Sequence, residues 1–264
     1  MSIIVKEYKT IIPNMGESVT NTISNRYKTV TKLINEKFWN INSDTKNSLY
    51  VGSYGRGTAI STSDIDILVC LPESEYIHFN TIKGNSQSRL LQAVRQNILS
   101  IYPTSRVRAD GQVIIIEFSG NIKFEILPAF KNYYNDTYKY PDSNMGGRWL
   151  STRPKIEQEA IKTKNIDTDG LLINTCKYIR YIRDNYFSSY YLSGIVIDSF
   201  VYNALAYTYR RFANTYSYHS YLLDHFKTLS GYITTPGSQE SISISKSNFC
   251  LEKVLNYMVR TSIS

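Results

Sequence analysis

The chain reads Val51-Gly52-Ser53-Tyr54-Gly55-Arg56-Gly57-Thr58 and, after four intervening residues, Ser63-Asp64-Ile65-Asp66-Ile67-Leu68. Branched residues and a stop at Pro72 predict a strand over 65–71. Side chains two apart on a strand project from the same face, so Asp64 and Asp66 are expected to point together. Two unpaired carboxylates repel each other, and such a pair must be solvated, hydrogen-bonded or bound to cations. The stretch therefore predicts a cation site at the start of a strand.

A third carboxylate stands in Lys123-Phe124-Glu125-Ile126-Leu127-Pro128. Phe124 and Ile126 alternate with Glu125, which predicts a strand that can lie beside the first one. Magnesium is the hard cation that takes one or two carboxylates together with substrate phosphates. With two such ions about 3.5 to 4 Å apart, one activates an attacking hydroxyl and the other steadies a leaving pyrophosphate. We therefore predict that the catalytic residues and ligands of two Mg²⁺ ions are Asp64, Asp66 and Glu125.

The glycine-rich segment is predicted to hold phosphates. Gly52 and Ser53 end a strand at a tight turn, where backbone N–H groups and the serine hydroxyl can contact phosphates without a bulky side chain in the way. Gly57 and Thr58 are expected to restart the chain as a short helix whose N-terminus favours anions. Glycine-serine turns and Asp-x-Asp pairs are each common in loops, so neither is specific alone. Their combination here predicts nucleotidyl transfer from a nucleoside triphosphate.

Hydrophobic periodicity predicts a first lobe that mixes sheet and helix. Helical spacing over 18–40, with Ser18 as the N-cap, and over 86–102 alternates with strand patterns over 49–51 and 65–71. The strands expected next, joined by glycine-containing turns as in an antiparallel meander, cover 106–109, 113–118 and 122–127. Residues 131–153 are expected to form a long surface segment. We predict a nucleotidyltransferase catalytic lobe over 1–153, with a mixed or antiparallel sheet and helices.

After Pro154 the pattern becomes helical. The expected helices cover 155–164, 169–186, 195–212, 216–232 and 251–259. The serine-rich stretch 234–247 is expected to be a flexible loop. The sequence thus predicts an α+β protein in which the catalytic lobe packs on an all-helical second lobe over 154–264.

Composition bounds the class of protein. The net charge of +8 and pI near 9.2 suggest an anionic partner, either phosphates or nucleic acid, although a lysine-rich proteome would give the same balance. The three cysteines form no C-x-x-C pair, which argues against disulfides and zinc. The three histidines have no acidic or cysteine partner at ligand spacing and are expected to be structural or surface residues. Without a signal peptide or a membrane-length apolar run, the expected location is the cytoplasm, with no membrane partner.

These residues resemble the DNA polymerase beta-like nucleotidyltransferase superfamily, whose motif is Gly-Ser, a spacer and Asp-x-Asp. Within it, the chain resembles the bacterial cGAS/DncV-like nucleotidyltransferases (CD-NTases of the SMODS type) over most of its length. The glycine-rich segment with Asp64-Ile65-Asp66 carries the resemblance, together with Phe124-Glu125-Ile126-Leu127-Pro128-Ala129-Phe130, Pro141-Asp142-Ser143-Asn144-Met145-Gly146-Gly147-Arg148-Trp149-Leu150, Thr152-Arg153-Pro154-Lys155 and Thr175-Cys176-Lys177-Tyr178-Ile179-Arg180.

The resemblance implies synthesis of cyclic dinucleotides or cyclic oligonucleotides from NTPs, as second messengers in antiphage defence. It implies phosphate binding by Gly52 and Ser53, and Lys177 and Arg180 are candidates for the triphosphate tail, the alternative being a solvated helix face. The family's third acid is usually aspartate, and the longer Glu125 suggests lower activity or tuning to Mn²⁺ instead of Mg²⁺. The implied partners are ATP, GTP or pyrimidine NTPs, with a regulatory protein or RNA in addition.

Other functions use the same carboxylates. One alternative is a nucleotidyltransferase that modifies a tRNA end or a protein hydroxyl, and another is an inactive relative that senses nucleotide or RNA. The segment Gly146-Gly147-Arg148-Trp149 favours the messenger synthase. Base choice, linkage, ring size, activating signal and oligomeric state are open at the level of sequence.

Overall fold

The chain forms two compact units in a computed structural model that describes residues 2–205, 212–238 and 240–262. The first, here called the sheet unit, contains Met15–Gly55 and Asp64–Arg153. The second, the helical unit, contains Met1–Asn14, Arg56–Ser63 and Pro154–Ser264. Residues 1–14 and 56–63 thus belong to the helical unit, whereas the sequence predicts a single division of the chain after residue 153. The physical reason is burial, because Ile4, Val5, Tyr8 and Ile60 join the core of the helical unit.

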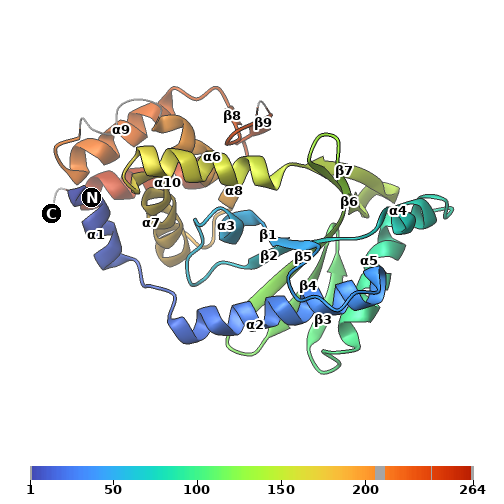
Figure 1. Cartoon of the computed structure of the whole chain (residues 1–264). Helices are drawn as coiled ribbons and strands as arrows, with labels where there is room; N and C mark the ends of the chain where they lie inside the picture. The colour runs from blue at the N-terminus through green and yellow to red at the C-terminus, as the bar shows by residue number, and fades with distance from the viewer. Residues whose placement is uncertain (1, 206–211, 239, 263–264) are drawn as a thin grey trace. The chain divides into compact units, whose positions relative to one another are not determined.

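The sheet unit is built around a seven-stranded sheet (Figure 1). Five strands follow the order β1-β2-β5-β4-β3, β6 pairs with the far end of β5, and β7 pairs with β6. Among the strand pairs of the described residues in this sheet, β2 and β5 run parallel and the others run antiparallel. The elements of this unit are α2 (Glu17–Ile34), the π-helical turn η1 (Asn35–Trp39), β1 (Ser48–Tyr50), α3 (Gly52–Gly55), β2 (Ile65–Cys70), α4 (Glu73–Asn80), α5 (Ser86–Leu99), β3 (Arg106–Asp110), β4 (Val113–Phe118), β5 (Ile122–Asn132), β6 (Thr137–Asp142), the 3₁₀ turn η2 (Asn144–Gly146) and β7 (Arg148–Thr152).

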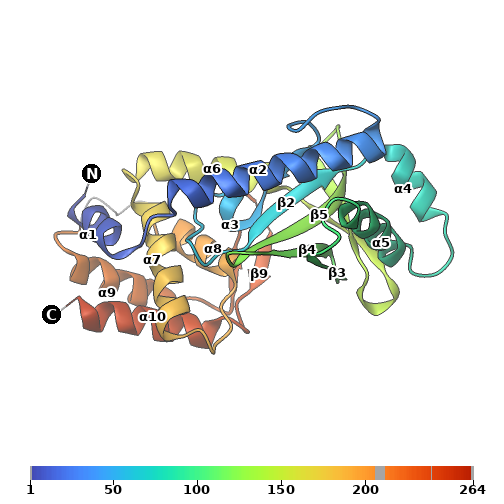
Figure 2. The same ribbon diagram turned by 90° about the horizontal axis from the view of Figure 1, so that it is seen from below.

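Helices α2 and α5 lie along one face of this sheet (Figure 2). The alternating residues Ile65, Ile67 and Val69 of β2 point to that face and are almost fully buried. They pack with Val30 of α2 and Leu90 of α5 in one hydrophobic cluster. Because strand side chains alternate, the neighbours of the buried residues must project from the opposite face. The core therefore fixes which face carries Asp66.

The helical unit consists of packed helices and one short hairpin. Its core includes α1, α7, α8, α9 and α10. The three cysteines of the chain are buried free thiols, of which Cys176 and Cys250 lie in this unit and Cys70 lies in β2 of the sheet unit. The elements of this unit are α1 (Ile3–Ile11), α6 (Pro154–Asp167), α7 (Leu171–Tyr186), α8 (Gly194–Ala204), α9 (Thr215–Lys227), β8 (Tyr232–Thr234), β9 (Ser241–Ser243) and α10 (Asn248–Thr261).

The predicted α+β class is confirmed, and several local predictions are corrected. Residues 131–153 are not an irregular segment, because they continue β5 and form the β6–β7 hairpin, in which Tyr140 pairs with Leu150. Residues 232–243 contain the β8–β9 hairpin instead of a flexible loop, so the second lobe is not all helix. Helix α2 begins after an N-cap at Gly16, not at Ser18. The end of the helix predicted over 195–212 lies partly outside the described residues.

Candidate active site

Gly52 and Ser53 begin α3 directly after β1, and this turn lies against the start of β2. The Val51 amide donates a hydrogen bond to the Asp66 carbonyl at 2.9 Å. Gly52 has a φ of +57°, and a Cβ atom at this position would stand 1.9 Å from Oδ2 of Asp66. Both the backbone conformation and the close approach therefore require glycine. The turn that was predicted to hold phosphates is thus in contact with one of the predicted catalytic carboxylates.

The register of two strands brings the predicted carboxylates together. Asp66 of β2 lies directly opposite Glu125 of β5 in a parallel pair. Side chains of residues that face each other across a strand pair share one side of the sheet. Asp64, two residues before Asp66, belongs to the same side. The side chains of Asp64 and Glu125 are 45% and 26% exposed, so both can reach solvent.

Lys123 was not predicted as a site residue, and it lies between two of these carboxylates. Its Nζ atom donates to Oδ2 of Asp64 at 2.7 Å and lies 2.7 Å from Oε1 of Glu125. Partial burial alone would lower the pKa of Lys123, but the hydrogen bonds to Asp64 and Glu125 outweigh it, so its pKa is raised. Lys123 therefore carries a full positive charge at neutral pH. A signal in the sequence existed, because Lys123 stands two residues before Glu125 and shares its face.

The three carboxylates have the chemistry of a site for hard cations, but their arrangement in this structure is not that of a metal site. Within residues 2–205, 212–238 and 240–262, no group of three or more His, Cys, Asp and Glu side chains has the arrangement of a metal site. Oxygen donors from Asp64, Asp66 and Glu125 suit Mg²⁺ and Mn²⁺ by chemistry. Two of them already share one cation, the Lys123 ammonium. The donor set thus fits a divalent ion, while its geometry in this structure is arranged around a lysine.

Gly57 and Thr58 do not start a helix, contrary to the prediction. The helical turn lies earlier, over Gly52–Gly55, and the chain then enters the helical unit at Arg56. The Thr58 side chain is fully buried and its hydroxyl donates to Oδ2 of Asp198 at 2.9 Å. Burial of this hydroxyl requires a partner, and the partner is a carboxylate of α8. Thr58 therefore anchors the segment and presents no helix N-terminus to an anion.

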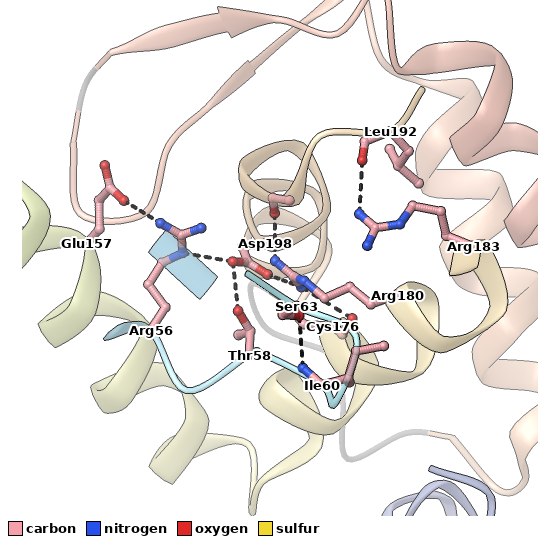
Figure 3. Close-up of polar contacts among 11 residues, drawn as sticks. Arg56, Thr58, Ile60, Ser63, Glu157, Cys176, Arg180, Arg183, Leu192 and Asp198 are labelled. Atoms are coloured by element: carbon pink, nitrogen blue, oxygen red, sulfur yellow. Dashed lines mark hydrogen bonds and ion pairs between the residues drawn. The ribbon is translucent and has the colours of Figure 1, made fainter. Parts of the chain in front are cut away.

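Asp198 organises a buried charge cluster in the helical unit (Figure 3). Its carboxylate is fully buried and accepts hydrogen bonds from Nη1 of Arg180 at 2.6 Å and from Nε of Arg56 at 2.7 Å. Burial acts to raise the pKa of Asp198, but the charges of Arg180 and Arg56 prevail and hold it at about 2. Arg56 also reaches Glu157 of α6 at 3.0 Å. The cluster ties the end of the glycine-rich segment to two helices of this unit.

The two candidates for the triphosphate tail have different environments. Arg180 is 1% exposed, and besides Asp198 it donates to the Gly194 carbonyl at 2.9 Å. Its burial and its protein partners speak against the predicted phosphate role. Lys177 is only partly buried, and burial, followed by the charges of Lys9 and Arg180, lowers its pKa. Binding an anion stabilises the charged form of an ammonium that is poorly solvated and has positive neighbours. Lys177 therefore remains a candidate for binding the triphosphate.

Sequence reasoning missed the role of Asp198 although a signal was present. It is the one acidic residue within the largely apolar helix predicted over 195–212. A charged residue in a core helix must be paired, and this expectation points to arginine partners elsewhere. The partner Arg56 could not be identified, because it lies 142 residues away.

Comparison with known proteins assigns the family. Residues 4–165, more than half of the chain, match the Second Messenger Oligonucleotide or Dinucleotide Synthetase domain. The chain belongs to this family. Family membership confirms the predicted enzyme class, a nucleotidyltransferase that synthesises a nucleotide second messenger. No curated protein sequence matches the chain.

Solved structures of this synthetase family share the fold. The STING-associated CdnE c-di-GMP synthase of Capnocytophaga granulosa superposes with a TM-score of 0.74 at 15% identity, over 98% of this chain and 87% of that one. The Elizabethkingia meningoseptica CdnE cyclic dinucleotide synthase, solved with GTP and Apcpp, gives 0.64 at 15% identity, over 94% and 99%. The Rhodothermus marinus CdnE c-UMP-AMP synthase gives 0.64 at 13% identity, over 97% and 94%. These matches confirm the cGAS/DncV-like fold.

The helices of the chain are short or carry polar residues along their length. Among the described residues, none of them has both the length and the apolar character required to span one.

Proposed function

We propose that the sheet unit catalyses metal-dependent nucleotidyl transfer with Asp64, Asp66 and Glu125. The observation that carries the proposal is the register of β2 and β5, which places Asp66 directly opposite Glu125. Asp64 joins them through the cation that it shares with Glu125. Acidic residues from two neighbouring strands that share one face are a suitable ligand set for ions that also bind phosphates.

These three carboxylates would hold two Mg²⁺ ions, with Mn²⁺ as the alternative. When bound, the ions neutralise the phosphate charge and make the acceptor hydroxyl a better nucleophile. Glu125 is longer than the family's usual aspartate, so its carboxylate reaches further from the strand. This difference in reach supports Mn²⁺ as the alternative ion, because Mn²⁺ tolerates less regular coordination than Mg²⁺ does.

The remaining residues position the triphosphate. Gly52 allows the backbone of the β1–α3 turn to approach the phosphates, and we assign phosphate contacts to Ser53 and to Lys177. In the transfer itself, the acceptor hydroxyl gives its proton to solvent water and its oxygen bonds to the α-phosphorus, while the bond from that phosphorus to the bridging oxygen breaks and pyrophosphate leaves. A second transfer within the linear product closes the ring. Placement and charge neutralisation supply most of the catalysis in such reactions.

The product that we propose is a cyclic dinucleotide or cyclic oligonucleotide made from ATP, GTP or pyrimidine NTPs. The family description supports a nucleotide messenger, and two solved relatives contain nucleotides or their analogues. A role in antiphage defence within the cytoplasm, with an effector that reads the messenger, fits the STING association of the Capnocytophaga granulosa enzyme. A regulatory protein is a further candidate partner, since Escherichia coli CdnC has been solved in a complex with a HORMA protein.

The test is product formation by the purified full chain. The four radiolabelled NTPs are supplied singly and in pairs, with Mg²⁺ or Mn²⁺, and the products are treated with phosphatase. We expect a phosphatase-resistant product in at least one combination. Its absence in every combination would overturn the proposal in favour of a sensing relative, and label transferred to added tRNA or protein would favour a macromolecule-modifying enzyme.

A charge-matched pair of variants shows whether the assigned residues are responsible. Asp66→Asn should abolish product formation, because it removes one carboxylate from the proposed ligand set. Asp110→Asn, at an exposed position of β3 in the same unit, should leave product formation unchanged. Equal activity of the two variants would contradict the assigned mechanism.

A further inference from the structure

Lys123 occupies a position that a metal ion would need. Its ammonium is bound at 2.7 Å by Asp64 and at 2.7 Å by Glu125, and its side chain is 30% exposed. Two of the three carboxylates to which we assign metal binding are thus engaged with a cation that is covalently part of the chain. A divalent ion that binds both of these oxygens must displace the ammonium, because two cations at the same oxygens repel each other.

The sheet provides a third carboxylate, that of Glu117, to which this lysine can move. Lys123 lies directly opposite Glu117 in the antiparallel pair of β5 and β4. The two side chains therefore share the face that also carries Glu125. Glu117 contacts two arginines of β3, with Arg106 at 3.3 Å and Arg108 at 3.9 Å. These pairs are largely exposed and weak, so Glu117 can accept another cation at little cost.

Charges of alternating sign cross this face of the sheet. Asp64, which directly precedes β2, is followed across the sheet by Lys123 of β5, Glu117 of β4 and Arg106 of β3. Lys123 is the member with acidic groups on both sides. A lysine side chain has a flexible stem of four carbons, which allows its ammonium to exchange between neighbours on one strand pair.

We propose that Lys123 is a tethered placeholder cation, which competes with divalent metal for Asp64 and Glu125 and turns towards Glu117 when metal enters. The inference rests on the proposed function, because it takes the metal ligands from there. Its consequence is that the free enzyme binds divalent ions weakly. A nucleoside triphosphate brings additional negative charge, so metal binds well only together with substrate, and Lys123 acts as a positioning residue that couples the two events.

The test measures Mn²⁺ binding to the full chain without nucleotide, by the electron paramagnetic resonance signal of the free ion. Lys123→Met should bind Mn²⁺ roughly three- to tenfold more tightly than the wild type, as expected from the loss of two competing ion pairs. Lys123→Arg, which keeps the charge, should bind as weakly as the wild type. Lys131→Met is the matched control on the same strand, because its partner is Asp136 at 3.2 Å, and it should change nothing.

A double-mutant cycle tests whether the Lys123 ammonium moves to Glu117 when metal binds. Glu117→Gln removes the destination of Lys123 and should weaken Mn²⁺ binding in the wild-type background more than in the Lys123→Met background. Equal effects in both backgrounds would overturn the exchange between the two sites. Mn²⁺ affinity of Lys123→Met no higher than that of the wild type would overturn the placeholder role. If Lys123→Met fails to fold, as judged by circular dichroism, Lys123→Gln replaces it with the same expectations.

The outcomes separate this inference from the proposed function. If Lys123→Met binds Mn²⁺ more tightly but the wild-type chain forms no product from any NTP, the placeholder role is supported and the synthase mechanism is contradicted. Unchanged Mn²⁺ binding in a chain that does form product would contradict the placeholder alone.

Discussion

A Cβ atom on Gly52 would stand 1.9 Å from Oδ2 of Asp66, and 2.5 Å from its Cγ. The φ of Gly52 is +57°, so alanine would be strained there even without the contact. We expect Gly52→Ala to displace the turn or the carboxylate and to abolish product formation. Gly120→Ala is the control, because Gly120 has a φ of +79° with open space around it. It should lose about 1–2 kcal/mol of stability in urea unfolding and remain active, and equal activity of the two variants would contradict this reasoning.

Glu125 can be tested by charge and by length. Glu125→Gln keeps the shape and removes the charge, and it should lower the turnover rate by on the order of 10²–10³-fold, as for other lost electrostatic contacts to a transition state. Glu125→Asp keeps the charge on a shorter arm and restores the acid usual in the family. It should remain active and shift the ratio of rates in Mn²⁺ and Mg²⁺ towards Mg²⁺. A fully active Glu125→Gln would remove this residue from the proposed ligand set.

Lys177 should contribute mainly to binding of the triphosphate. Lys177→Gln is expected to raise the KM for NTP about tenfold, as for the loss of a hydrogen bond to a charged group, with a smaller change in kcat. Lys162→Gln, at an exposed position of α6 where the side chain pairs with Glu159 at 3.9 Å, is the control and should leave KM unchanged. An unchanged KM in Lys177→Gln would indicate that the residue belongs to a solvated helix face.

Asp198 should matter for stability. Asp198→Asn leaves Arg56 and Arg180 with unbalanced charge in a buried site, and removing one partner of a buried ion pair costs about 3–5 kcal/mol. We expect a loss of this size in the free energy of unfolding, measured with denaturant. The control Asp224→Asn breaks an exposed pair with Lys227 and should have no measurable effect. A loss no larger than that of the control would show that the cluster is not stabilising.

His219 should make stability depend on pH. Burial lowers the pKa of His219 to about 4, below its ordinary value of 6.5, and its ring contacts Tyr8, Tyr178 and the Met258 carbonyl. Because the unfolded chain binds the proton more readily, the stabilisation is present above pH 6.5 and is lost as pH falls from 6.5 to 4. Unfolding free energies at pH 7, 6 and 5 should fall less steeply in His219→Gln than in the wild type. Identical slopes would refute the assignment.

The features that follow from the regular spacing of side chains along one strand or helix were predictable from the sequence. Asp64 and Asp66 share a face because side chains alternate along a strand, and the same alternation places Phe124 and Ile126 in the core beside Glu125. Helix α5 was expected from its apolar spacing and begins at Ser86. In contrast, the segment 131–153 has polar, proline- and glycine-rich composition, and its hairpin forms because β5 continues beyond its pairing with β4 and β2 and offers an edge to β6.

The sequence by itself determined which side chains are carboxylates, their spacing along each strand and the glycine that their approach requires. Only the tertiary structure decided that Asp66 lies opposite Glu125, that Lys123 binds both Asp64 and Glu125, and that Asp198 meets Arg56. The physical reason is the range of the interactions. Spacing on one strand or helix follows from local backbone geometry, whereas the pairing of strands and the partners of a buried charge depend on contacts between residues far apart in the chain.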